Sequence, residues 1–123
     1  MSTALLGLRT VVYRASDREK ARDWYAAAFG IKPYFDEPFY VGFNIGVYEL
    51  GLDPNAPAGG DGSSTTYWGV PKLDLALASL IASGATIHDP AHDVGESIRV
   101  ASVKDPFGNV LGLIENPGFT LPK

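Results

Sequence analysis

Apolar and polar residues follow two different periods along this chain, and each change of period predicts a change of secondary structure. A run rich in β-branched and aromatic residues at positions 8–14 predicts a strand. Apolar residues then recur at helical spacing, and Gly30 supplies a left-handed stop for the helix. Ser16 and Glu19 have the spacing of a capping box at its start. The apolar face of this helix consists of Ala21, Trp24, Tyr25, Ala28 and Phe29.

Three short strands are predicted after this helix, at residues 32–36, 39–45 and 47–52, with Pro38 and Gly46 between them. The first half of the chain therefore has the order β-α-β-β-β. Residues 53–64 are rich in Gly, Pro, Asp and Ser, which predicts a linker.

The same order begins again after the linker. Residues 65–70 predict a strand, and Asp74 is the expected N-cap of a helix that ends at Gly84. We expect Leu77, Leu80 and Ile81 to form the buried face of this helix. Further strands are predicted at residues 85–88, 97–103 and 110–115.

The two halves have equivalent landmarks. Gly30 and Gly84 end equivalent helices 54 positions apart, and Tyr13 and Tyr67 are separated by the same offset. A period of this length that occurs twice indicates an internal duplication rather than a solenoid.

Composition narrows the class of protein. A chain of 123 residues fits one domain, and the absence of cysteine excludes disulfides and thiolate chemistry and suits the cytoplasm. No apolar stretch approaches the roughly 20 residues that cross a bilayer, and the N-terminus has no pattern of a secretory signal. A net charge of -4 without a basic stripe argues against nucleic acid as a partner. We therefore expect a cytoplasmic protein that binds neither membranes nor nucleic acid.

Two motifs carry a resemblance to a known family. Residues 24–30 (Trp-Tyr-Ala-Ala-Ala-Phe-Gly) and the turn at residues 105–109 (Asp-Pro-Phe-Gly-Asn) resemble the first-helix ending and the closing hairpin of the vicinal oxygen chelate superfamily. This superfamily includes glyoxalase I, bleomycin-resistance proteins and extradiol dioxygenases. The resemblance implies an α+β fold in which two βαβββ modules form curved sheets around a cavity, and it implies a homodimer.

The expected domain covers the whole chain. Module one spans about residues 8–52 and the linker residues 53–64, while module two spans about residues 65–116 and a C-terminal tail residues 117–123.

The resemblance also implies where metal ligands would stand. Counting back from the helix stops places the opening-strand positions at Thr10 and Thr65. The closing-strand positions fall at Glu49 and at Gly112, four residues after the turn glycine, where the family's metalloenzymes have a carboxylate ligand. Only Glu49 is a strong ligand, whereas a divalent first-row metal generally needs three or more nitrogen, sulfur or carboxylate donors. Glu115 is a poor substitute, because an odd offset from Gly112 turns it to the other face of a regular strand. We therefore expect no metal and no cofactor.

The two histidines, His88 and His92, have a spacing that allows metal chelation from one helix face. Pro90 between them argues against a helix. We interpret this segment as a solvated hairpin loop with Asx-type turns rather than as a metal site.

Alternation along the strands places other residues beside Thr10 and Glu49 on the cavity face. Arg14 matches an arginine that glyoxalase-like relatives use near the carboxylate end of the substrate, so it is a candidate for an anionic group. A strand-end arginine in water, or paired with Asp17, is the alternative. The predicted ligand-binding residues are Thr10, Arg14, Tyr40, Thr65 and Tyr67, where Tyr40 and Tyr67 are chosen from the aromatic residues as contacts for a planar ligand.

Glu49 has three interpretations. Desolvation in an apolar cavity would raise its pKa and suit it to act as a general base. It could instead contact a ligand, or hold the cavity floor together through hydrogen bonds. The sequence thus predicts a protein that binds a small organic, anionic or aromatic ligand without the usual metal. The alternative is a metal-independent lyase or isomerase with Glu49 as its base.

Overall fold

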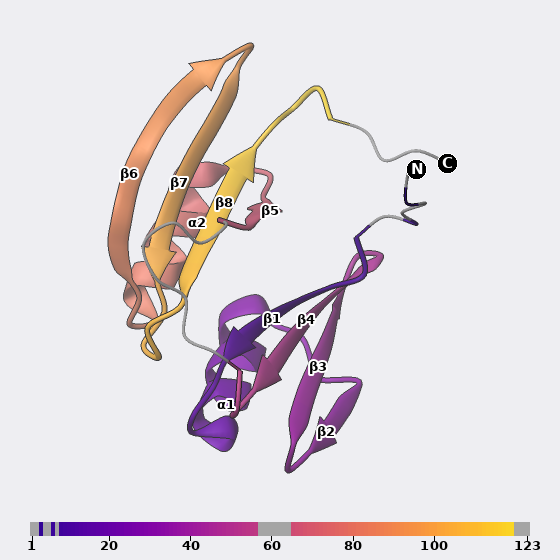
Figure 1. Ribbon diagram of the computed structural model, residues 1–123. Helices are drawn as coiled ribbons and strands as arrows, with labels where there is room; N and C mark the ends of the chain where they lie inside the picture. The colour runs from indigo at the N-terminus through magenta and orange to yellow at the C-terminus, as the bar shows by residue number, and fades with distance from the viewer. Residues whose placement is uncertain (1–2, 4–5, 7, 57–64, 120–123) are drawn as a thin grey trace. The chain divides into compact units, whose positions relative to one another are not determined.

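The computed structural model describes residues 3, 6, 8–56 and 65–119, and it contains two four-stranded sheets that each carry one helix (Figure 1). The chain divides into two compact units, residues 1–57 and 58–123. The first unit contains β1 (Thr10–Arg14), α1 (Arg18–Phe29), β2 (Phe35–Glu37), β3 (Tyr40–Ile45) and β4 (Tyr48–Asp53). The second unit contains β5 (Tyr67–Gly69), α2 (Leu73–Ala82), β6 (Thr86–Gly95), β7 (Ile98–Lys104) and β8 (Val110–Glu115).

Both units have the same topology. The strand orders are β1-β4-β3-β2 and β5-β8-β7-β6. In each unit the first strand runs parallel to the last, and the other pairs are antiparallel. The predicted α+β architecture of two βαβββ modules is therefore confirmed.

Each core lies between a sheet and its helix. Strand side chains alternate between faces, so every second residue of β3 and β4 points toward α1, and the same holds for β7, β8 and α2. Tyr25 on α1 is completely buried, as the predicted apolar face requires. The fully buried strand residues on these faces include Val41, Phe43, Leu50, Leu52, Ala101, Val103 and Leu111.

The start of α1 differs from the prediction. Asp17, not Ser16, is the N-cap, and its carboxylate accepts a hydrogen bond of 3.1 Å from the Lys20 amide. Aspartate and serine are similarly good caps, so sequence alone does not choose between neighbours. The end of α1 is as predicted, because Gly30 has φ 66° in the left-handed region.

The start of α2 also differs from the prediction. Lys72 is the N-cap without a side-chain hydrogen bond, and Asp74 lies inside the first turn. The cap comes from another element: the Glu115 carboxylate on β8 accepts a 2.7 Å hydrogen bond from the Leu73 amide. Glu115 therefore faces α2, and a carboxylate at this end of the helix is also favoured by the helix dipole.

The buried face of α2 contains Leu77 and Leu80, as predicted, but Ile81 is 45% exposed. Leu73 completes the buried face instead, because it lies one turn before Leu77.

Arg99 on β7 forms ion pairs with two neighbouring elements. Its guanidinium lies 3.1 Å from the Asp74 carboxylate on α2 and 3.4 Å from the Asp93 carboxylate on β6.

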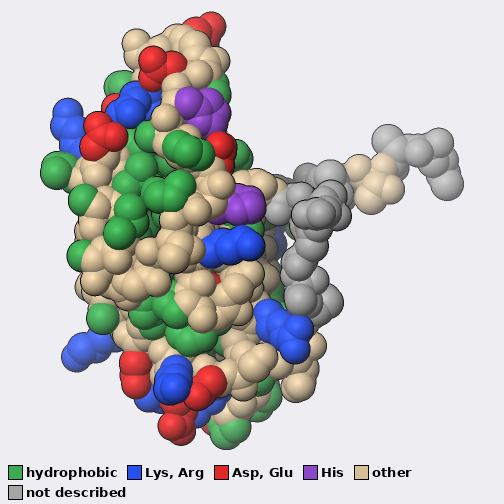
Figure 2. All heavy atoms as spheres, turned by 90° about the vertical axis from the view of Figure 1, so that its left-hand side faces the viewer, with side chains coloured by type: hydrophobic (Ala, Val, Ile, Leu, Met, Phe, Trp, Pro, Cys, Tyr) green, Lys and Arg blue, Asp and Glu red, His purple; other side chains and the backbone are tan. Residues whose placement is uncertain are grey.

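The segment that contains the histidines is a strand, so the predicted hairpin loop is wrong. β6 runs through His88, Pro90 and His92 at the edge of its sheet, and its pairing with β7 shifts register at several bulges. An edge strand tolerates proline because one side of it pairs with no neighbour. Figure 2 shows both histidine side chains at the surface.

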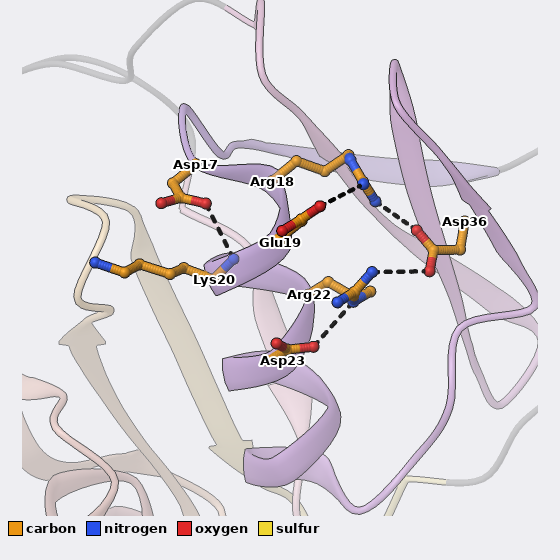
Figure 3. Close-up of polar contacts among 7 residues, drawn as sticks. All are labelled: Asp17, Arg18, Glu19, Lys20, Arg22, Asp23 and Asp36. Atoms are coloured by element: carbon orange, nitrogen blue, oxygen red, sulfur yellow. Dashed lines mark hydrogen bonds and ion pairs between the residues drawn. The ribbon is translucent and has the colours of Figure 1, made fainter.

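A set of ion pairs attaches β2 to α1 (Figure 3). Arg18 and Arg22 are four residues apart on α1, and they bind opposite oxygens of the Asp36 carboxylate at 2.5 and 3.1 Å. Since Asp36 faces α1, its neighbours Phe35 and Glu37 face the other side of the sheet. The ion pairs thus help to fix the orientation of a strand that has only three residues.

Two predicted segments lie partly outside the described residues. These are most of the linker, residues 57–64, and the end of the tail, residues 120–123. Neither helix in the part of the chain that the structure describes is long and apolar enough to span a membrane.

Candidate functional site

The candidate site lies on the face of the first sheet that is turned away from α1. Glu49 on β4 is flanked there by Thr10 on the parallel strand β1 and by Asn44 on the antiparallel strand β3. The next residue, Leu50, points to the opposite face and is fully buried. The period of the strand thus places a carboxylate on the open face and an apolar side chain in the core.

Three hydroxyl groups donate hydrogen bonds to the Glu49 carboxylate. The Thr10 and Tyr40 hydroxyls both donate to Oε1 at 2.5 Å, and the Tyr34 hydroxyl donates to Oε2. Both carboxylate oxygens are therefore committed within the protein. We call these four residues the Glu49 cluster.

Two glycines give the tyrosine rings of the Glu49 cluster their space. A Cβ atom on Gly51 would lie 1.9 Å from the Tyr40 hydroxyl oxygen. A Cβ atom on Gly42 would lie 2.8 Å from both the Glu49 carboxylate and the Tyr34 ring. Because both glycines lie on the same face as Glu49, the tyrosines lie across the sheet and reach the carboxylate.

The hydrogen bonds control the protonation of Glu49. Partial burial acts to raise the pKa of its carboxyl group, but the hydrogen bonds from Thr10, Tyr34 and Tyr40 outweigh this effect and hold the pKa below its usual value. The increase in pKa on which the general-base interpretation depended is therefore not found, whereas the interpretation of Glu49 as a hydrogen-bonded residue agrees with these contacts. Burial and the bond to Glu49 raise the pKa of Tyr40 to about 12, so this phenol remains a donor at neutral pH.

The lowered pKa of Glu49 predicts a pH dependence of stability. The ionised cluster stabilises the fold fully above the ordinary carboxyl pKa of 4.5, and this contribution is lost as the pH falls through the lower value of the folded state. We expect the stability difference between wild type and Glu49→Gln to shrink over the acidic range, as the pH falls below the ordinary carboxyl pKa of 4.5. Urea unfolding across this range measures it.

An exposed glutamate of the same sheet provides the control for this measurement. Glu37→Gln should change stability little at any pH. A stability difference between wild type and Glu49→Gln that stays constant over the range would show that the carboxylate is not stabilised in its ionised form.

The structure brings together three of the residues that were predicted for the site: Glu49, Thr10 and Tyr40. It adds Tyr34, which the sequence did not indicate as a site residue. Tyr34 lies within the strand predicted at residues 32–36, but β2 begins only at Phe35, so alternation along the predicted strand does not apply to it. The residue that could have indicated a role for Tyr34 is Gly42, because the Tyr34 amide donates a hydrogen bond to the Gly42 carbonyl oxygen.

Arg14 lies on the same face as Thr10, at the other end of β1. It is exposed, and its register partner on β4 is Asp53, which has a carboxylate. Val12 lies between Thr10 and Arg14 on this face and is 43% exposed. A role of Arg14 in holding an anionic group stays a prediction.

The equivalent position in the second unit has a different composition. Tyr67 is in register with Gly112, as Thr10 is with Glu49. Thr65, the position counted back from Gly84, precedes β5. The residue that pairs with Gly112 lies two positions later in the chain, at Tyr67. The reason is that α2 has 10 residues where α1 has 12, so the register position of the second unit lies closer to its helix stop. A Cβ on Gly112 would lie 2.9 Å from the Tyr67 ring.

The chain belongs to a known superfamily. The profile of the glyoxalase/bleomycin resistance protein/dioxygenase superfamily matches residues 7–113. This confirms the resemblance to the vicinal oxygen chelate superfamily that the two sequence motifs indicated.

Individual relatives agree with this assignment. The chain is 28% identical over 112 residues to CFP32 of Mycobacterium bovis, which is named as a glyoxylase, and the match covers 81% of this chain. The chain spans only 42% of the length of that relative. The same values hold for CFP32 of Mycobacterium tuberculosis.

Solved structures share the fold. A glyoxalase-related enzyme from Fulvimarina pelagi superposes with a TM-score of 0.75 at 18% identity, over 96% of this chain and 94% of that one. Lactoylglutathione lyase from Agrobacterium tumefaciens gives a TM-score of 0.72 at 18% identity, over 95% and 100% of the two chains. At these identities the likeness concerns the fold alone.

Proposed function

We propose that this protein binds a small organic molecule at the open face of the first sheet, without the divalent metal of its metalloenzyme relatives. One observation carries the proposal: the only strong ligand among the expected metal positions, Glu49, already receives hydrogen bonds on both oxygens. Binding of this kind needs a complementary surface rather than a reaction centre.

The residues at the four expected positions do not fit a divalent transition metal. Thr10, Thr65, Glu49 and Gly112 supply one carboxylate, and this number does not change when Tyr67, the register partner of Gly112, takes the place of Thr65. A first-row metal generally requires three or more strong donors. Among the residues that the structure describes, no group of three or more His, Cys, Asp or Glu side chains lies together.

The ligand class follows from the residues of the face. Glu49, Thr10 and Tyr40 offer polar contacts beside exposed aromatic rings, and Arg14 on the same strand is the candidate for an anionic group. Tyr67 and Thr65 remain proposed contacts of the second module. This set supports a small amphiphilic or aromatic ligand.

The alternative function, a metal-independent lyase or isomerase, requires Glu49 to accept a proton. A base is most effective when its pKa lies near the working pH. The hydrogen bonds from Thr10, Tyr34 and Tyr40 lower the pKa of Glu49, which makes its carboxylate a weaker base at neutral pH. The geometry therefore favours binding over base catalysis.

Three further properties complete the proposal. A cytoplasmic location is supported by the cysteine-free composition, and the absence of a basic stripe supports a protein that does not bind nucleic acid. A homodimer is supported by the resemblance to relatives of similar length. Analytical ultracentrifugation measures the oligomeric state directly.

Calorimetric titration with Zn²⁺ and Ni²⁺ tests the metal part of the proposal, and native mass spectrometry of gently purified protein tests the ligand part. We expect no stoichiometric metal binding that depends on Glu49, and we expect an organic molecule that is retained in the gas phase. One bound metal ion per chain, lost in Glu49→Ala, would overturn the proposal. His92→Ala is the control, because it removes adventitious binding to the exposed histidines of β6.

A further inference from the structure

The protons of the Glu49 cluster can all be assigned. Thr10, Tyr34 and Tyr40 each have one hydroxyl proton, and all three protons point to the Glu49 carboxylate. An ionised carboxylate has no proton to donate. All hydroxyl donors of the cluster therefore form hydrogen bonds within the cluster.

The outer side of the cluster consequently offers only lone pairs. A hydroxyl oxygen that donates its proton still accepts hydrogen bonds, and an ionised carboxylate has about four lone-pair sites, of which three are used. In the part of the chain that the structure describes, no group from outside the cluster donates to these hydroxyl oxygens. A ligand that docks here must bring the donors.

The ionisable side chains near the cluster also favour a positively charged ligand. Glu37 on β2 faces the same side as Glu49, because it is two residues from Phe35, the partner of Gly42. Among the described residues of β1–β4 that point to this face, the one cationic side chain is that of Arg14, which lies beside Asp53 at the far end of β1. The part of the face around the cluster is therefore negative.

An exposed group of aromatic rings adjoins the cluster. Phe35 lies 5.9 Å from Phe39, 6.5 Å from Tyr34 and 6.2 Å from Tyr40, measured between ring centroids. Tyr34 and Phe39 are 57% and 64% exposed. Two of the four rings belong to the Glu49 cluster, so the acceptors and the apolar surface are continuous. Aromatic rings of this kind provide a large contact area for a planar body.

We propose that the ligand of this face is an organic cation with N–H donors on a planar apolar body, such as an arylamidine or an arylalkylammonium ion. The N–H groups bond to the hydroxyl oxygens and the free lone pair of Glu49, and the planar body lies against Phe35 and Phe39. This inference rests on the proposed function and names the ligand class for it. Arg14 alone would favour an anionic ligand, whereas this inference names a cationic one.

Four probes of similar size and different polar groups separate the possible bases of recognition. Benzamidine has a positive charge and N–H donors, benzamide is neutral, benzoate is negative, and phenyltrimethylammonium is positive without N–H groups. Calorimetric titration of each should show benzamidine as the tightest ligand, with phenyltrimethylammonium and benzamide at least roughly tenfold weaker and benzoate without binding.

Two substitutions connect this binding to the cluster. Tyr34→Phe removes one acceptor from an exposed position and should weaken benzamidine roughly tenfold. Glu49→Gln should abolish the preference for benzamidine over benzamide. Tyr48→Phe is the matched control, because Tyr48 is the neighbour of Glu49 on β4 and points to the other face. It should bind benzamidine as wild type does.

The outcomes distinguish this inference from the proposed function. Equal binding of phenyltrimethylammonium and benzamidine would overturn the hydrogen-bonding argument. Tightest binding of benzoate, lost in Arg14→Ala, would overturn the inference while a metal-free binding function stands. Binding of none of the four probes would also overturn it, whereas a Glu49-dependent metal site would contradict the proposed function itself.

Discussion

Replacing Gly112 with alanine is expected to lower the free energy of unfolding by about 3 kcal/mol. The added Cβ would lie 2.4 Å from the Thr66 carbonyl oxygen and 2.9 Å from Cδ1 of Tyr67. The Thr66 oxygen accepts the Gly112 amide at 2.9 Å, so it cannot retreat without weakening the pairing of the two strands. Chemical denaturation of the purified variant measures the loss.

Gly69→Ala is the matched control for this substitution. Gly69 lies on β5, the strand that pairs with the strand of Gly112, and an added Cβ would meet no atom within 4 Å. We expect a change within about 0.5 kcal/mol. Equal stability of Gly112→Ala and wild type would mean that β5 and β8 are farther apart than described.

The surroundings of Gly112 also bear on the proposal that no metal is bound. A carboxylate side chain at this position would have to displace the neighbouring strand and the Tyr67 ring. We therefore expect that Gly112→Glu alone would not supply a metal ligand.

Replacing Asp105 with alanine is expected to lower the free energy of unfolding by about 3 kcal/mol. Asp105 is 5% exposed and organises the turn before β8. Its Oδ1 accepts the amides of Phe107 and Asn109 at 2.9 and 2.8 Å, and its Oδ2 accepts the Asn109 side chain at 2.9 Å. Alanine would leave these donors without their acceptor in a partly buried turn. Thermal and urea unfolding measure the effect.

Asp105→Asn should have an intermediate effect. Its carbonyl oxygen still accepts the two backbone amides, but its NH₂ group meets the Asn109 amide, which is also a donor. A stability of Asp105→Ala close to that of wild type would show that the turn is held by its backbone bonds alone, which join Asp105 to Asn109 and Gly108.

The two predicted stability losses explain why the closing hairpin was informative in the sequence. The residues Asp-Pro-Phe-Gly-Asn form a turn whose aspartate satisfies several donors at once, and Gly108 has φ 91°, which favours glycine. The motif is therefore local chemistry, and it could be recognised without knowledge of the fold.

Properties that depend on neighbours in sequence were predicted well. The order of elements, the left-handed Gly30 and the bounds of β8 at 110–115 agree with the structure. The elements and the helix stop follow from a period or a turn that a few consecutive residues define. The resemblance to the superfamily also implied that Thr10 and Glu49 share one face, and they are in register.

Properties that depend on distant partners were not predicted. The cap of α2 comes from Glu115, 42 positions after Leu73, and nothing near the helix indicates it. The pKa of Glu49 falls rather than rises because hydroxyls from three other segments reach its carboxylate. Burial alone, on which the general-base interpretation depended, has the opposite effect, and the sequence offered hydrogen bonding of Glu49 only as one of three interpretations.

The sequence by itself determined that this is a duplicated βαβββ chain whose single strong metal-ligand candidate is Glu49. Only the tertiary structure decided that Tyr34 joins the site, that Tyr67 rather than Thr65 is in register with Gly112, and that the Glu49 carboxylate is held ionised by three hydroxyls. The periods of strands and helices are set by local backbone geometry, which neighbouring residues specify. Hydrogen bonds across the sheet form between segments whose separation in the chain carries no signal, so their consequences for charge and binding appear only in the folded protein.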